Sequence, residues 1–137
     1  MPEPISHHEA LIYVMVTMSA VDRKMTDEEL SRIGDIVSNL PIFDDFQEEQ
    51  LVTYAEACGE ILSSEGGLDE VLRLVALGLP KRLHETAYAL ALEVAAADMD
   101  VRPEEVRLLD LLAGALKLDK LITAAIERGI RARLARA

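Results

Sequence analysis

A short acidic pattern that occurs twice constrains the fold of this chain more than any other feature of its sequence. Residues 20–30 and 96–106 align with an offset of 76 positions. The same register continues on both sides over roughly thirty residues, which identifies an internal repeat. The matched residues are Asp22 with Asp98, Met25 with Val101, Glu28 with Glu104, Glu29 with Glu105, His8 with His84, Ile33 with Leu109, Ile36 with Leu112 and Leu40 with Leu116.

Each copy of the repeat has the pattern of a helix–turn–helix. A helix ends near an aspartate, a tight turn with one apolar residue follows, and a second helix opens on two glutamates. Glutamate is favoured in a first helical turn because it bonds the cap N–H and opposes the positive end of the helix dipole. We expect repeat one to span about residues 6–40 and repeat two about residues 82–116, related by a pseudo-twofold axis.

Composition and helix-start signals predict an all-α fold. Half of the 137 residues are hydrophobic but only two Phe and three Tyr are present, so the core is expected to be aliphatic. Capping residues and apolar spacings of three and four predict about seven helices in one compact bundle, and a single domain over residues 1–137. The expected helices are 6–22, 26–40, 45–62, 68–79, 81–97, 103–116 and 119–134.

The apolar spacing also predicts which helix faces are buried. The first helix is expected to bury a stripe made of Leu11, Val14, Met15, Met18 and Val21. The helix 103–116 is expected to bury Val106, Leu109, Leu112, Ala113 and Leu116. The last helix is expected to keep its arginines outside and to bury Leu121, Ile122, Ala125, Ile126, Ile130 and Leu134.

The charge distribution restricts the possible partners. The formal net charge is −11, which argues against nucleic acid because phosphate binding needs a basic surface. Ten acidic residues and no Lys or Arg lie between Arg32 and Arg73, whereas residues 128–137 contain four arginines and no acid. Such asymmetry usually reflects solvated faces and dipole matching. The sharper interpretation is a surface that binds a cation or a basic partner.

The sequence indicates a cytoplasmic protein. The first residues lack the positively charged segment of a signal peptide. The longest nearly apolar run, residues 10–21, is too short to span a bilayer. A single cysteine excludes an internal disulfide framework and suits a reducing compartment.

No residue pattern indicates catalysis. Cys58 has no neighbouring histidine or base that would lower its pKa. Gly66-Gly67 lacks the spacing and the lysine of a phosphate-binding loop. His84-Glu85 does not begin a zinc-binding H-E-x-x-H motif, because Tyr88 stands at the place of the second histidine. We therefore expect a non-enzymatic protein.

The repeated acidic turns are the candidate functional site. Asp22 and Asp98 lie at helix C-termini, where a carboxylate faces the negative end of the dipole, so capping does not explain them as it explains Glu29 and Glu105. If the two turns pack together, these four carboxylates converge and Asp100 lies nearby. An all-oxygen ligand set suits Ca²⁺ or Mg²⁺. The alternative is that the acidic turns only cap helices.

Two features limit the predicted ion site. An EF-hand is excluded because its twelfth position, which requires a bidentate glutamate, would be Ile33 or Leu109. Arg23 and Lys24 place competing positive charge beside the first turn. We therefore expect weak affinity, and a stronger contribution from the second turn, which has two aspartates.

At these residues the chain resembles the TerB-like family, named for tellurite-resistance protein B. The family pattern is a helix ending Ala-x-Ala-Asp-Gly, then one residue, an apolar residue, three residues and a Glu that opens the next helix. Residues 95–105 fit this pattern, and residues 19–29 fit it more loosely. Arg23 and Met99 stand where the family has Gly, the residue that most readily adopts positive φ.

The resemblance implies a small, non-enzymatic cytoplasmic module of an all-helical fold, linked to metal-oxyanion and other stress responses. It also implies divalent-cation binding by acidic residues and assembly with other proteins, including membrane-associated ones. Three functions remain open at this point. They are a cation-responsive interaction module, a pure protein-interaction scaffold without an ion, and an enzyme that uses paired carboxylates.

Overall fold

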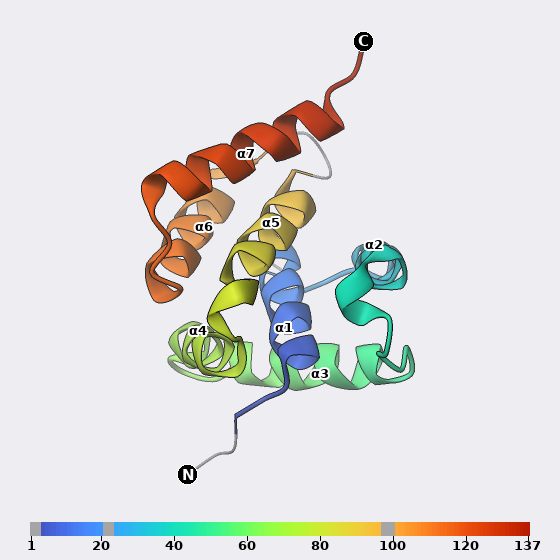
Figure 1. Ribbon diagram of the computed structural model, residues 1–137. Helices are drawn as coiled ribbons and strands as arrows, with labels where there is room; N and C mark the ends of the chain where they lie inside the picture. Colours follow the sequence, from blue (N-terminus) through green and yellow to red (C-terminus); the bar gives the residue numbers. More distant parts are fainter. Residues whose placement is uncertain (1–3, 21–23, 97–100) are drawn as a thin grey trace.

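The computed structural model describes residues 4–20, 24–96 and 101–137, and within them the chain forms a bundle of seven α-helices (Figure 1). Two short 3₁₀ turns precede α3 and α5. The helices are α1 His7–Ser19, α2 Asp27–Asn39, α3 Gln50–Leu62, α4 Gly67–Gly78, α5 His84–Ala95, α6 Pro103–Ala115 and α7 Lys120–Leu134, and the 3₁₀ turns are η1 Pro41–Phe43 and η2 Lys81–Leu83. The predicted all-α class and helix number are confirmed.

Helix α1 lies at the centre of the bundle. Every residue from position 10 to position 19 is buried, including Thr17 and Ser19. Helices α2, α3, α4 and α5 all pack against it. The prediction of a single buried stripe was therefore incomplete, because this segment has no charged residue and its two polar ones are small enough to be buried on any face.

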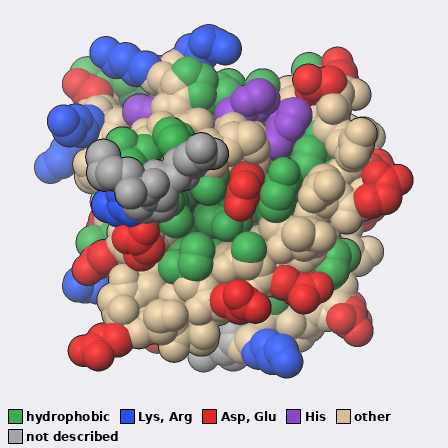
Figure 2. Space-filling view, turned by 90° about the horizontal axis from the view of Figure 1, so that it is seen from below, with side chains coloured by type: hydrophobic (Ala, Val, Ile, Leu, Met, Phe, Trp, Pro, Cys, Tyr) green, Lys and Arg blue, Asp and Glu red, His purple; other side chains and the backbone are tan. Residues whose placement is uncertain are grey.

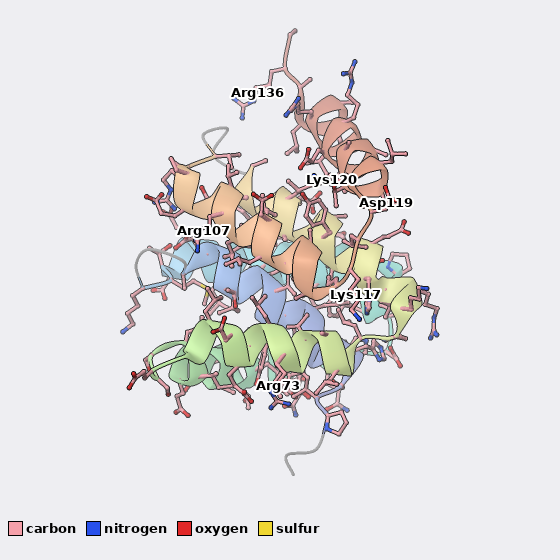
Figure 3. All side chains as sticks on the ribbon, turned by 90° about the vertical axis from the view of Figure 1, so that its left-hand side faces the viewer. Arg73, Arg107, Lys117, Asp119, Lys120 and Arg136 are labelled. Atoms are coloured by element: carbon pink, nitrogen blue, oxygen red, sulfur yellow. The ribbon has the colours of Figure 1, made fainter. Side chains whose placement is uncertain are left out.

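Helix α5 is the second central element. It packs against α1, α6 and α7. In Figure 3, α1 and α5 run side by side in the same direction, so that their C-terminal ends lie toward the same side of the molecule. Helix α2 follows α1 in the chain and packs against it, and α6 follows α5 and packs against it.

Most helices begin where their capping residues predict. The hydroxyl of Ser6 accepts the N–H of Glu9 at 3.1 Å. Thr26 and Glu29 form a reciprocal capping box at the start of α2. Pro103 is the first residue of α6, and Asp119 accepts the N–H of Leu121 at 2.7 Å at the start of α7 (Figure 3).

Helix α3 begins five residues later than the predicted Asp45. The expected capping pair does not form, because Glu48 instead accepts a hydrogen bond from the Ser38 hydroxyl of α2 at 2.9 Å. Phe43 and Phe46 also hold this segment by packing edge to face, with ring centroids 5.5 Å apart. Tertiary contacts therefore override the local helix-start signal.

The outer helices correct two predictions of burial. Helix α7 has no buried residue, and Leu121 is 81% exposed, although Ile126 and Ile130 pack against the core as expected. In α6 the buried face includes Leu108, whereas Val106 is 48% exposed. The C-terminal arginines are all exposed, as predicted. Helix α7 therefore contacts the core through a narrower face than the positions of its apolar residues predict.

The loop before α4 depends on two glycines. Gly66 has φ +71°, in the left-handed region that L-residues adopt only at a cost. Gly67 is buried, and a Cβ there would collide with the carbonyl of Ile61. This pair lets the chain reverse tightly between α3 and α4.

Candidate functional site

Glu29, the glutamate of the first turn, is part of a helix cap. It lies at the third position of α2, where its Oε1 accepts the backbone N–H of Thr26 at 2.9 Å. In return, the Thr26 hydroxyl accepts the N–H of Glu29 at 3.2 Å. The carboxylate is half-buried. Its local role is therefore the one that capping predicts for this position.

Glu105, the glutamate of the second turn, is buried and ion-paired. Only 6% of the residue is exposed. Its Oε1 accepts the backbone N–H of Arg102 at 3.0 Å and the Nε–H of the same residue at 3.3 Å. Arg102 stands 76 positions after Thr26 and supplies a positive charge that the capping pattern did not predict.

The three aspartates of the predicted ion site, Asp22, Asp98 and Asp100, lie outside the described residues. The structure therefore does not test whether they converge with Glu29 and Glu105. Within the described part of the chain, no three His, Cys, Asp or Glu side chains are grouped closely enough to hold a metal ion.

His8 and His84, which stand 76 positions apart in the sequence, both connect helices. His8 donates from Nε2 to the carbonyl of Ile42 at 2.7 Å, stacks on Phe43 with centroids 5.2 Å apart, and lies 3.4 Å from Asp45. Burial, and then the neighbouring His8, lower the pKa of His7. These contacts fix the start of α1 against the segment between α2 and α3.

His84 makes the corresponding link in the second half. Its Nδ1 lies 3.2 Å from the carbonyl of Leu116, at the end of α6, and its Nε2 lies 3.2 Å from the carbonyl of Leu79. Since both partners only accept, a neutral ring donates to one of them at a time. The histidines hold helix ends together, and no local sequence pattern predicts their carbonyl partners.

Cys58 is built into the core. It is fully buried, contacts the Thr17 hydroxyl at 3.6 Å and donates to the carbonyl of Tyr13 at 3.7 Å. Burial raises the pKa of its thiol to about 11, so the thiolate needed for nucleophilic chemistry is scarce at neutral pH. The predicted role as a small core residue agrees with this geometry.

The hydroxyls of two buried tyrosines donate hydrogen bonds to glutamates. Tyr13 donates to Glu9 at 2.7 Å within α1, and Tyr88 of α5 donates to Glu127 of α7 at 2.8 Å. Burial and the adjacent carboxylate raise the pKa of both phenols, so they stay protonated. The first pair lies within α1, and the second connects the central helix α5 to the outer helix α7.

Two hollows flank the helix–turn–helix units. The first, of about 770 Å³, lies between the end of α1, the start of α2 and the outer face of α3. The second, of about 480 Å³, lies between the end of α5, the start of α6 and α7. Neither was predicted, because a surface hollow depends on how three separate helices pack.

The molecular surface is unevenly charged around these helices. Figure 2 shows the face formed by α3 and α4, where hydrophobic side chains gather near the middle with acidic side chains around them, while basic side chains lie mostly along one edge. Helix α3 carries Glu56 and Glu60 and no basic residue. No described helix is long and apolar enough to cross a membrane.

Comparison with known proteins identifies one family. The model of the family described as tellurite resistance protein TerB matches residues 8–127, which extend from the first turn of α1 into α7. No curated protein and no solved structure matches the chain.

Proposed function

The chain belongs to the TerB family of tellurite resistance proteins, and from this membership we propose that it acts in tellurite resistance as a non-catalytic interaction module. The observation that carries the proposal is the extent of the family match, which includes both helix–turn–helix units and the helices between them. The protein would then contribute by binding other proteins of the response, including membrane-associated ones, in the cytoplasm.

The environment of the reactive side chains supports a non-catalytic role. The Cys58 thiol is buried and its pKa is raised to about 11. His8 and His84 are engaged with backbone carbonyls. The two hollows beside the repeats offer surface for a partner instead.

Survival of tellurite tests this proposal directly. Cells that lack the gene should be inhibited by less tellurite than the parent, and expression of the intact chain should restore growth. Leu11→Asp, which places a charge in the fully buried central helix, is the matched control that should not restore it. Equal tellurite sensitivity of parent and deletion strains would contradict the role. Steady conversion of tellurite by the purified protein with NADPH or thiol would contradict its non-catalytic nature.

We propose in addition that the second acidic turn binds Ca²⁺ or Mg²⁺ weakly. Support comes from the carboxylates that the sequence concentrates at this turn, Asp98, Asp100 and Glu105, with Asp22 and Glu29 at the first. Arg102 competes with an ion for the Glu105 carboxylate, because Arg102 already donates two hydrogen bonds to Glu105 Oε1. If no ion binds, the protein is an interaction scaffold whose acidic turns only cap helices.

We also propose that the repeat comprises three helices rather than two. The lining of the two hollows supports this, because four residues of the first hollow recur in the second with the offset of 76 positions. The matched pairs are Val16 with Leu92, Ala20 with Ala96, Met25 with Val101 and Leu30 with Val106. The third helix that lines each hollow follows the same offset. Ala55 and Gly59 of α3, in the first hollow, correspond to Arg131 and Ala135 at the end of α7, in the second. A crystal structure in which α1–α3 and α5–α7 do not superpose would contradict the repeat.

A further inference from the structure

The hollow between α1, α2 and α3 has the form of a groove lined by apolar side chains. Val16 and Ala20 come from the end of α1, Met25 and Leu30 from the start of α2, and Val52 from α3. Val52 is 50% exposed and adds apolar surface to the α3 side of the groove. The groove volume of about 770 Å³ leaves room for several side chains of another molecule.

Small residues form the α3 side of the groove. Ala55, Gly59 and Ser63 follow each other at intervals of four residues and therefore lie along one line of the helix. A Cβ added to Gly59 would meet no atom within 4 Å, so the space in front of it is open. A second helix could therefore approach the backbone of α3 closely at this point.

The rim of the groove is acidic. Asp27, Glu56 and Glu60 line it and are exposed, and among the described lining residues Lys24 is the basic one. The surrounding sequence strengthens this field, because no Lys or Arg occurs between Arg32 and Arg73. A polyanion would be repelled, whereas a positively charged partner would be attracted and oriented.

The chemistry of the groove distinguishes between a peptide helix and a small molecule. Sites for small molecules orient their ligands with a few placed polar groups. The charged side chains of this groove, Asp27, Glu56 and Glu60 with Lys24, are exposed, and its other described lining residues are apolar or small. An apolar trough with small residues and a charged rim is instead the form of a helix-binding groove.

We propose that this groove binds an amphipathic helix of a partner protein, apolar and small on one face and rich in Lys and Arg on its flanks. The proposal rests on the interaction-module function and specifies the chemistry of the partner. The apolar face would cover Val52, Met25 and Leu30 and pass over Gly59. The flanking bases would face Glu56 and Glu60 on one side and Asp27 on the other.

The second hollow provides an internal contrast. Arg131 of α7 lines it at the position that corresponds to Ala55 of α3. This side chain adds positive charge to a wall that also contains Asp110 and Glu127, whereas three acidic residues and Lys24 line the first groove. The volume of the second hollow is also smaller, about 480 Å³. We therefore expect the basic helix to select the first groove.

Binding of a designed peptide tests the proposal. The probe is a fluorescent peptide of about 18 residues with Leu and Ala on one helical face and Lys and Arg on the others. Its anisotropy should rise on titration with the full chain, and its helicity should increase. A peptide with Glu in place of every base should bind at least tenfold more weakly. Equal binding of the two peptides, or no binding of the basic one, overturns the proposal.

Two sets of variants locate the site. Gly59→Leu should fill the open space over α3 and weaken peptide binding at least tenfold without lowering the melting temperature. Gly114→Leu is the matched control, because Gly114 is also exposed, helical and without neighbours within 4 Å, but lies outside both hollows, and it should leave binding unchanged. The double variant Glu56→Lys, Glu60→Lys should also weaken binding and reduce its salt dependence.

Other outcomes would contradict the assignment. Unchanged affinity in both Gly59→Leu and the double charge variant would exclude this groove. If Val106→Asp abolishes peptide binding and Gly59→Leu leaves the affinity unchanged, the peptide binds in the second hollow. Dimerisation of the wild-type chain that is broken by Gly59→Leu would show that a second copy occupies the groove. A variant that loses peptide binding but still restores tellurite resistance would show that the groove is not needed for resistance. The proposed function in tellurite resistance would be unaffected by that result.

Discussion

Arg102 donates both its backbone N–H and its Nε–H to the same carboxylate oxygen of Glu105, at 3.0 and 3.3 Å. The Glu105 side chain is 7% exposed and that of Arg102 is 31% exposed. At the position 76 residues earlier, Thr26 and Glu29 form a capping box in which the Thr26 hydroxyl accepts the N–H of Glu29. The two turns therefore start their second helices by different chemistry, although the glutamate is common to both.

This pair makes Arg102→Ala a test of the second turn. Removal of the guanidinium leaves a buried carboxylate with less compensation, so the free energy of unfolding should fall by about 1–3 kcal/mol. Thr26→Ala in the first turn should cost about 1 kcal/mol, the usual value for an N-cap. Urea unfolding of both variants checks the order. A larger loss for Thr26→Ala would show that the Arg102 pair contributes little.

Two glycine substitutions should change stability in opposite directions. Gly67→Ala should lower the free energy of unfolding by more than about 1 kcal/mol, because the new methyl group collides with the Ile61 carbonyl. Gly59→Ala, in an exposed helical position, should raise it by up to about 1 kcal/mol. Thermal unfolding of the pair measures both. Similar melting temperatures would contradict the packing of the α3–α4 loop.

The Cys58 thiol should be inert in the native protein and should make stability depend on alkaline pH. Its pKa is raised from 9.0 to about 11, so the folded state holds the proton more tightly than the unfolded state. The corresponding contribution, of the order of 2–3 kcal/mol, is complete below pH 9 and is lost as the pH rises toward about 11. Urea unfolding from pH 8 to pH 11 measures it.

Cys58→Ala is the control for that measurement, because other groups also titrate in this range. The variant should lose less stability than the wild type between pH 9 and pH 11. A thiol reagent at pH 8 should modify native Cys58 far more slowly than the urea-unfolded chain. Identical pH profiles for the two proteins, or rapid labelling of the native one, would be inconsistent with a buried protonated thiol.

Calcium and magnesium should bind weakly if the acidic turns form a site. Millimolar Ca²⁺ or Mg²⁺ should then raise the melting temperature through linkage and shift amide resonances of residues flanking both turns. Asp98→Asn should weaken the effect more than Asp22→Asn, because the second turn also contains Asp100. Sodium chloride at equal ionic strength controls for screening. An unchanged melting temperature and amide spectrum would reject the ion site. The alternative, an interaction scaffold whose acidic turns only cap helices, would then hold.

The sequence predicted the helices well because their limits depend on local chemistry. Ser6, Thr26, Pro103 and Asp119 each act on neighbouring backbone groups, and α1, α2, α6 and α7 begin beside them. Helix α3 shows the limit of such reasoning. Its start is displaced because Ser38, ten residues away, takes the Glu48 carboxylate, and no local pattern contains that contact.

The candidate site was predictable only in part for the same reason. Capping specified the positions of Glu29 and Glu105, and both were found at the third residue of their helices. The arginine partner of Glu105 and the apolar groove beside Gly59 arise from packing between elements. The predicted convergence of the carboxylates remains a prediction, because three of them lie outside the described residues.

The burial of residues 10–19 of α1 has a consequence for synthesis of the chain on the ribosome. This helix is made before all four helices that cover it, and α5, one of its main partners, ends 76 residues after α1 does. The nascent chain must therefore carry an uncovered apolar segment until most of the sequence has been translated, a situation that invites chaperone binding or aggregation. Final folding is thus expected to follow translation rather than accompany it.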